Sequence, residues 1–227
     1  MNRKKCRHTQ MSVGGKSFRI INVKGDGSCF YRCIWRIARS DGDVARVLLI
    51  DNLEDEDDGT EEVRYVVALT LKYEKYAQMM LSDLIEVYKA APFIIENYPI
   101  LKHVDCDGSL VANCKSVADV IENTKIMASS FELDVIRGCL SEAACDIGLI
   151  VLVRDDTLEL EDLAEKLLKE LHIALGKCKN ERVTVIINEE NIHYKYTKIL
   201  GEIVNSRDKL VAWTQDLMEE EDEEDVE

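Results

Sequence analysis

The longest apolar stretch in the sequence is short, and its length limits what the chain can build. Residues 148–153 read GLIVLV, which is the length of a buried strand and far below the roughly 18 apolar residues of a membrane span. The chain therefore has to form its core from several short elements, and we expect no membrane segment. Its 227 residues, 46% of them hydrophobic, suffice for one sizeable core or two small ones.

Strand-like and helical patterns follow one another along the chain. Helices are predicted at 29–39, from 61 to the residues before Pro92, and at 116–127, 132–147 and 160–175; residues 94–107 are expected to be irregular, and strands are predicted at 17–23, 149–154, 183–187 and 192–199. One α+β domain with a central β-sheet flanked by helices accounts for this order. We expect a flexible basic arm over 1–16, the domain over 17–205 and a C-terminal segment with an acidic tail over 206–227.

The acidic residues are concentrated in two runs. The chain has 44 acids and 29 bases, a net charge of −15, but residues 54–62 hold seven of the acids and residues 219–227 hold eight. The rest of the chain is formally neutral, which argues against a nucleic-acid binder because such proteins need concentrated positive charge. We predict that the 54–62 run is a solvated loop inserted into the domain.

The eight cysteines indicate a reducing compartment rather than a disulfide framework. The chain is long, has no CxxC motif, and its basic N-terminus lacks the apolar segment of a signal peptide. His103, Cys106 and Cys114 could supply three zinc ligands, but a fourth is missing. We therefore predict free thiols, a cytoplasmic location, and neither a metal nor another cofactor.

One cysteine follows a tight turn and begins a helical pattern. Residues 25–31 read GDGSCFY, so Cys29 falls in the first turn of the predicted helix, with Asp26 or Ser28 as a candidate N-cap. Unpaired N–H groups and the helix dipole favour a thiolate there, and the same N–H groups could stabilise an oxyanion. Glycine would let the backbone approach a substrate carbonyl closely. The alternative is a buried structural cysteine after an ordinary turn.

A cysteine nucleophile also needs a base, which is often distant in sequence. Of the four histidines, His193 alone lies on a predicted strand directly after a turn, where a rigid element could aim its ring. His8 lies in the expected arm, His103 in an irregular segment and His172 on a helix. Taken alone, His193 is also compatible with a structural role.

Together these segments resemble the ovarian tumour (OTU) family of cysteine proteases. The similar features are, in chain order, the strand and the Gly-Asp-Gly-Ser-Cys turn with its helix, a long helical middle region, Phe131-Glu132-Leu133 with the helix and strand after it, and the His193-Tyr194 strand. The resemblance covers roughly residues 17–205 and implies a single papain-like protease domain. It departs from the family at 128–130, where Ala-Ser-Ser replaces the usual Trp-Gly-Gly or a similar sequence.

The resemblance also implies roles for individual residues. Cys29 would be the nucleophile, His193 the general base, and Asp26 part of the catalytic loop that shapes the oxyanion site. The positions next to the substrate would be Gly27, Ser28 and Tyr194, of which Tyr194 would pack beside the histidine.

The third catalytic member is less clearly marked. The family commonly places Asp or Asn two residues after the histidine, but here that position is Lys195, which cannot accept a hydrogen bond from an imidazole N–H. Asn191 shares a strand face with His193 and is the first candidate for orienting its ring. An acid from the N-terminal arm or another loop is an alternative, as is a two-member site.

By resemblance, the expected function is that of a deubiquitinase: a thiol protease that hydrolyses isopeptide bonds of ubiquitin conjugates. Ubiquitin and polyubiquitin chains are the expected partners, and the 54–62 run could attract the basic tail of ubiquitin. The alternatives are a weak or inactive OTU-like module that binds ubiquitin, and a protease for another ubiquitin-like modifier or a polyprotein. A short chain with little beyond the catalytic domain would also suit a viral or bacterial effector in a host cytosol.

Overall fold

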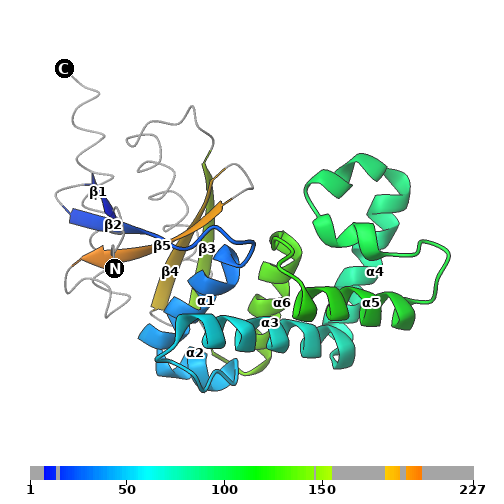
Figure 1. The fold of residues 1–227 in the computed structure, drawn as a ribbon, viewed down its shortest axis with the longest axis horizontal. Coiled ribbons are helices and arrows are strands. Elements are labelled where there is room, and N and C mark those ends of the chain that lie inside the picture. Colours follow the sequence, from blue (N-terminus) through cyan, green and yellow to red (C-terminus); the bar gives the residue numbers. More distant parts are fainter. Residues whose placement is uncertain (1–7, 14–15, 146, 155–181, 190–192, 201–227) are drawn as a thin grey trace, which may run out of the picture. The chain divides into compact units, whose positions relative to one another are not determined.

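The computed structural model describes residues 8–13, 16–145, 147–154, 182–189 and 193–200. The elements fall into two compact units, and each is described by itself (Figure 1). The first unit runs from Lys24 to Cys145, and the strands on either side of it in the sequence belong to the second. Cys29 lies in the first unit.

The unit from Lys24 to Cys145 is built from helices. They are α1 (Cys29–Ser40), α2 (Gly42–Val47), α3 (Glu56–Tyr73), α4 (Lys75–Ala90), the short 3-10 helices η1 (Pro92–Glu96) and η2 (Pro99–His103), α5 (Leu110–Asn123) and α6 (Ser130–Glu142). Helix α3 is central because it contacts α1, α4, α5 and α6, and Figure 1 shows it running beside α5. No helix among the described residues has the length and apolarity needed to cross a membrane.

The core of this unit consists of large apolar side chains on the inner faces of the helices. Burying one such side chain contributes roughly 1.5–3 kcal/mol relative to leaving it in water. The largest fully buried side chains are Trp35, Tyr31, Phe30, Ile34, Leu48, Leu71, Leu81, Ile100, Leu101, Ile121 and Ile136. Four of them, Phe30, Tyr31, Ile34 and Trp35, lie in the N-terminal half of α1, so this part of the helix is packed into the core.

Helices α1 and α3 approach each other closely at Gly59. A Cβ atom at this position would lie 2.1 Å from Nε1 of Trp35, so only glycine fits there. The same indole nitrogen donates a hydrogen bond to the carbonyl oxygen of Asn52 at 2.8 Å. Beside this contact, Arg36 of α1 forms a bidentate ion pair with Glu56 of α3, with an Nη2–Oε2 distance of 2.8 Å. Apolar and charged contacts together therefore set how α1 lies on α3.

The second unit contains five strands, β1 (His8–Val13), β2 (Lys16–Asn22), β3 (Ile147–Arg154), β4 (Arg182–Glu189) and β5 (His193–Leu200), in the order β1-β2-β5-β4-β3. Strands β3 and β4 are parallel and the other neighbours are antiparallel. Strand β1 lies within the segment predicted to be a flexible arm, where it pairs with β2. The predicted boundaries at residues 16 and 205 stay predictions.

The predicted fold class, a single α+β domain with a central β-sheet flanked by helices, is wrong. Every regular element between Lys24 and Cys145 is a helix, and the unit that holds the predicted nucleophile builds its core by packing helix on helix. The helical segments carry enough apolar side chains to bury their inner faces against one another.

The acidic run at 54–62 was predicted to be a loop, and this is also wrong. Helix α3 begins at Glu56, inside the run, and the side chain of Asp55 caps it by accepting hydrogen bonds from the backbone N–H groups of Asp57 and Asp58 at 2.8 and 3.2 Å. Negative charges in the first turn complement the positive end of the helix dipole. A dense acidic run is therefore a helix start here.

Other helix bounds also differ from those predicted. The long helix expected up to Pro92 is two helices that meet at Glu74, and the segment expected to be irregular contains η1 and η2. Helix α5 begins at Leu110 rather than 116, because Ser109 caps it by accepting a hydrogen bond from the N–H of Ala112 at 3.2 Å. The helix predicted at 160–175 lies outside the described residues. The α1 prediction is confirmed to within a residue.

Candidate functional site

The loop before α1 brings four of the predicted site residues together. Asp26, Gly27 and Ser28 lead directly into Cys29, the first residue of α1, whose side chain is almost completely buried at 2% exposure. Gly27 has a φ of +81°, which favours glycine, and a Cβ atom there would lie 2.0 Å from the carbonyl oxygen of Lys125. Both the backbone conformation and the close approach therefore require glycine immediately before Ser28.

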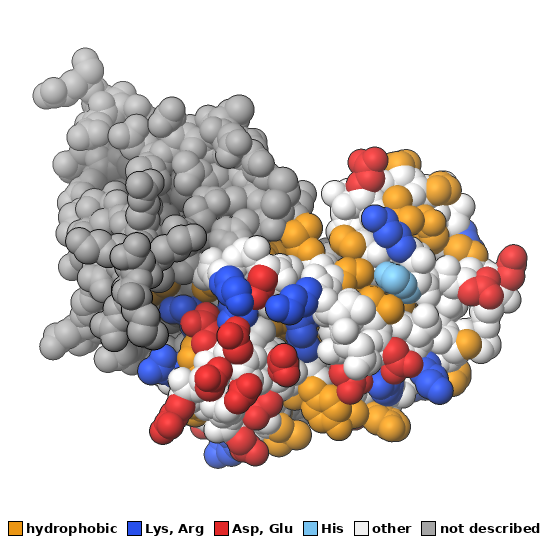
Figure 2. Space-filling model, in the orientation of Figure 1, with side chains coloured by type: hydrophobic (Ala, Val, Ile, Leu, Met, Phe, Trp, Pro, Cys, Tyr) orange, Lys and Arg blue, Asp and Glu red, His pale blue; other side chains and the backbone are white. Residues whose placement is uncertain are grey.

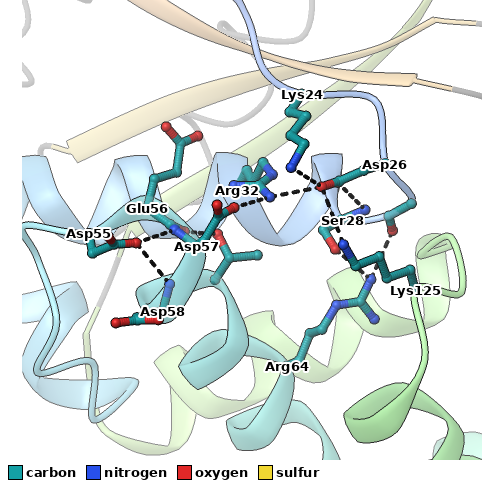
Figure 3. A network of polar contacts seen from close by, with 12 residues as sticks. Lys24, Asp26, Ser28, Arg32, Asp55, Glu56, Asp57, Asp58, Arg64 and Lys125 are labelled. Carbon is teal, nitrogen blue, oxygen red and sulfur yellow. Dashed lines mark hydrogen bonds and ion pairs between the residues drawn. The ribbon is translucent and has the colours of Figure 1, made fainter.

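Asp26 holds the loop from one side through both oxygens of its carboxylate (Figure 3). Its Oδ1 accepts the backbone N–H of Ser28 at 3.1 Å, and its Oδ2 accepts from Nη2 of Arg32 at 2.9 Å. Two lysine ammonium groups approach the same oxygen, that of Lys24 at 3.3 Å and that of Lys125 at 3.8 Å. Burial acts to raise the pKa of Asp26, but these hydrogen bonds and charges outweigh it and hold that pKa well below its usual range.

The bond from Ser28 changes one expectation for the oxyanion site. The sequence predicts that the backbone amides between Asp26 and Cys29 face a developing oxyanion. In the structure the N–H of Ser28 is donated to the carboxylate of Asp26 instead. The Ser28 amide therefore stabilises the loop rather than a substrate in this arrangement, and Asp26 acts as an internal acceptor.

Arg32 connects this loop to the acidic start of α3. Its guanidinium is buried and donates hydrogen bonds to Asp26 and to Asp57, whose own side chain is two-thirds exposed. Burial disfavours the charge of Arg32, but the two carboxylates outweigh it and raise its pKa. Asp57, in the predicted acidic insertion, is thus linked to the Ser28 amide by three successive contacts, through Arg32 and Asp26.

Arg64 of α3 holds the loop from the other side. Its side chain is buried, with 4% of the residue exposed, and its guanidinium lies over the ring of Tyr31 at 4.0 Å from the centroid. Burial lowers the pKa of Arg64, but an arginine stays charged in proteins. Its hydrogen bonds go to Gly27 O at 2.9 Å, Ser28 Oγ at 3.1 Å, Ile126 O at 3.2 Å and Ile121 O at 3.1 Å.

A buried carboxylate, Glu132, lies at the start of α6. Its Oε2 accepts hydrogen bonds from the backbone N–H and the hydroxyl of Ser129, both at 2.7 Å, and completes a capping box. Burial raises the pKa of Glu132, while these bonds and the charge of Arg64 act in the opposite direction. Glu132 of the Phe-Glu-Leu sequence therefore has a structural role, because it caps the N-terminus of α6.

The predicted base belongs to the strand-containing unit. His193 is the first residue of β5 and pairs with Glu189 of β4, and Tyr194, which is buried at 3% exposure, pairs with Asn188. Lys195 pairs with Ile187, and Asn191, the candidate for orienting the imidazole, lies outside the described residues. The pairing of His193 with Cys29, and the roles of Tyr194 and Asn191, stay predictions.

Two arginines that shape the site were missed in the sequence. Arg64 falls on the apolar stripe of α3, between Val63 and Val67, and an arginine on a buried helix face is a signal of an internal partner. Arg32 likewise lies among buried neighbours, six residues after Asp26. Neither partner could be named in advance, because the bonded atoms are a backbone carbonyl 37 residues away in one case and an acid from another helix in the other.

Comparison of the sequence with protein-family models finds no match, and comparison with curated proteins finds none either. A thiol stands at a helix N-terminus, and four cationic side chains surround the loop before it: Lys24, Arg32, Arg64 and Lys125. Three of these cations are paired with the Asp26 carboxylate, so the helix N-terminus and Arg64 are the features that favour negative charge on the sulfur, while the burial of Cys29 opposes it.

Proposed function

We propose that the protein is a cysteine-type hydrolase that uses Cys29 as its nucleophile and cleaves isopeptide bonds of ubiquitin conjugates. The observation that carries the proposal is the position of Cys29 at the start of α1, after a loop that Asp26 and Arg64 hold from two sides. The substrate class rests on the resemblance of the 25–31 and 193–194 motifs to the ovarian tumour proteases.

In the proposed reaction, His193 takes the proton of the Cys29 thiol, and the sulfur attacks the isopeptide carbonyl to form a tetrahedral oxyanion. His193 then gives a proton to the departing lysine amine, and the C–N bond breaks to leave a thioester on Cys29. Water, deprotonated by His193, attacks the thioester and releases the ubiquitin carboxylate and the thiol. The position of Cys29 at the N-terminus of α1 favours the thiolate that attacks.

The first test uses ubiquitin with an electrophilic group at its C-terminus. We expect the wild-type chain to form a covalent adduct, detected as a mass increase of one ubiquitin, and the Cys29→Ala variant to form none. Cys106→Ala is the matched control, because Cys106 is a partly exposed thiol outside the loop, and this variant should react like the wild type. An unreactive wild type, or a Cys29→Ala variant that still forms the adduct, would contradict the proposal.

A second candidate function is ubiquitin binding without cleavage. Two observations favour it: Lys195 occupies the position where an imidazole-orienting residue is expected, and Cys29 is only 2% exposed. In that case the wild type and Cys29→Ala bind ubiquitin equally, and no polyubiquitin linkage is cut. A parallel panel of other ubiquitin-like modifiers with the same electrophile separates a protease of different specificity from both.

A further inference from the structure

Arg64 differs from the other charged side chains of the helical unit in what it touches. It contacts the chain on both sides of Cys29: the Gly27 carbonyl and Ser28 hydroxyl before it, and the ring of Tyr31 two residues after it. Figure 3 shows its guanidinium reaching from α3 toward Ser28, on a different side of the loop from Arg32. Because Arg64 contacts residues before and after Cys29, it restrains the backbone at Cys29.

The hydrogen bonds of Arg64 also fix the loop against its surroundings. The same Nη2 that holds Gly27 and Ser28 donates to the carbonyl oxygen of Ile126, and Lys125, next to it, presents its carbonyl oxygen to Gly27. The loop is therefore clamped between the α5–α6 connection and α3. A lysine at position 64 has a single nitrogen, so it cannot serve the Ile121 carbonyl, which accepts from Nη1, together with the three acceptors of Nη2.

We propose that Arg64 is a positioning residue for the nucleophile: by holding the Gly27 carbonyl and the Ser28 hydroxyl, it fixes the backbone that presents the thiol of Cys29 to a substrate carbonyl. This inference rests on the proposed function of Cys29. Arg64 acts through the geometry of the loop, and small misplacements of a reacting group lower reaction rates strongly.

The test compares Arg64→Lys and Arg64→Met with the wild type, and Arg36→Met serves as the matched control. Arg36 likewise joins α1 to α3. Its side-chain hydrogen bonds go to Glu56 and not to the loop before Cys29. With the ubiquitin electrophile we measure the limiting rate of adduct formation and the concentration for half-saturation. We expect the rate to fall about 100-fold for methionine and about tenfold for lysine, with half-saturation changed less than about twofold.

A second measurement follows the loop itself by hydrogen–deuterium exchange of the full chain. In Arg64→Lys, the peptide covering 25–31 should exchange faster than in the wild type, while the peptide covering α4 should keep its rate. A role limited to core stability would slow adduct formation only in proportion to the unfolded fraction, which thermal melting measures. If Arg64→Met does not fold, Arg64→Lys decides the question.

The outcomes separate this inference from the proposed function. A wild type that forms no adduct overturns both. A reactive wild type with unchanged rates in folded Arg64 variants overturns the positioning role alone, and so does unchanged exchange of 25–31 in Arg64→Lys. An Arg36→Met variant as slow as Arg64→Met would show that any loss at the α1–α3 contact has this effect, and it would overturn the specific role of Arg64.

Discussion

At the scale of single residues, Gly27 has the least freedom to change. Its φ of +81° disfavours any side chain, and a Cβ atom would meet the Lys125 carbonyl at 2.0 Å. We expect Gly27→Ala to lower the free energy of unfolding by about 1–3 kcal/mol from backbone strain, with the close contact adding to the loss. Gly42→Ala is the control, because a Cβ atom there meets no atom within 4 Å. Chemical denaturation followed by circular dichroism measures both, and equal stabilities would contradict this account.

Asp26 should make stability depend on pH in the acid range. Its pKa is lowered in the folded state, so its contribution is fully present above the unfolded value near pH 4 and is lost as the pH falls through the lower folded value. The difference in unfolding free energy between the wild type and Asp26→Asn should therefore be constant from pH 5 to 7 and shrink below about pH 4. Urea titrations at several pH values measure it, and a gap that widens on acidification would show the opposite sign.

Residue-scale prediction from sequence succeeded where chemistry and spacing were local. The turn at 25–28 and the start of a helix at Cys29 are visible in seven consecutive letters, and both are found. The acceptor of the Ser28 amide and the donor to the Gly27 carbonyl were not predictable in the same way. The first requires the geometry of the Asp26 side chain, and the second requires knowing that α3 lies beneath the loop.

At the scale of elements, the acidic run at 54–62 shows that a high density of acidic residues does not indicate a loop, because α3 begins within it. Asp55 caps α3, and Glu56 and Asp57 pair with arginines of α1. Figure 2 shows acidic and basic side chains interspersed over α2 and the N-terminal half of α3. Counting charges along the chain predicted a solvated insertion, because counting cannot register counter-charges that come from a neighbouring helix.

The cap of α3 supports a prediction of its own. Asp55→Ala removes the acceptor for the Asp57 and Asp58 amides, and we expect it to lower the free energy of unfolding by about 1 kcal/mol. Glu54→Ala removes an equal charge one residue earlier, from an exposed position outside the cap, and should change stability by less than about 0.5 kcal/mol. Denaturation curves of the two variants check this, and similar losses in both would point to net charge rather than capping.

At the scale of the whole molecule, the sequence identified most helices and strands but not their grouping. The strand patterns at 17–23 and 149–154 are close to β2 and β3, and the helical patterns at 29–39 and 132–147 are close to α1 and α6. Periodicity reports which face of an element is buried, and it does not report against what. A helix that packs on other helices shows the same local pattern as a helix that packs on a sheet.

The contacts that complete the loop before Cys29 come from far along the chain. Gly27 is bonded to Arg64, and the same guanidinium reaches Ile121 and Ile126, which lie 57 and 62 residues beyond it in sequence. During synthesis, a chain that has not reached residue 121 lacks two of the four acceptors of Arg64, as well as the Lys125 carbonyl against Gly27. Cys29 is therefore synthesised before the residues that complete the contacts of its loop, and those contacts form only after α3 and α5 have been synthesised and have packed.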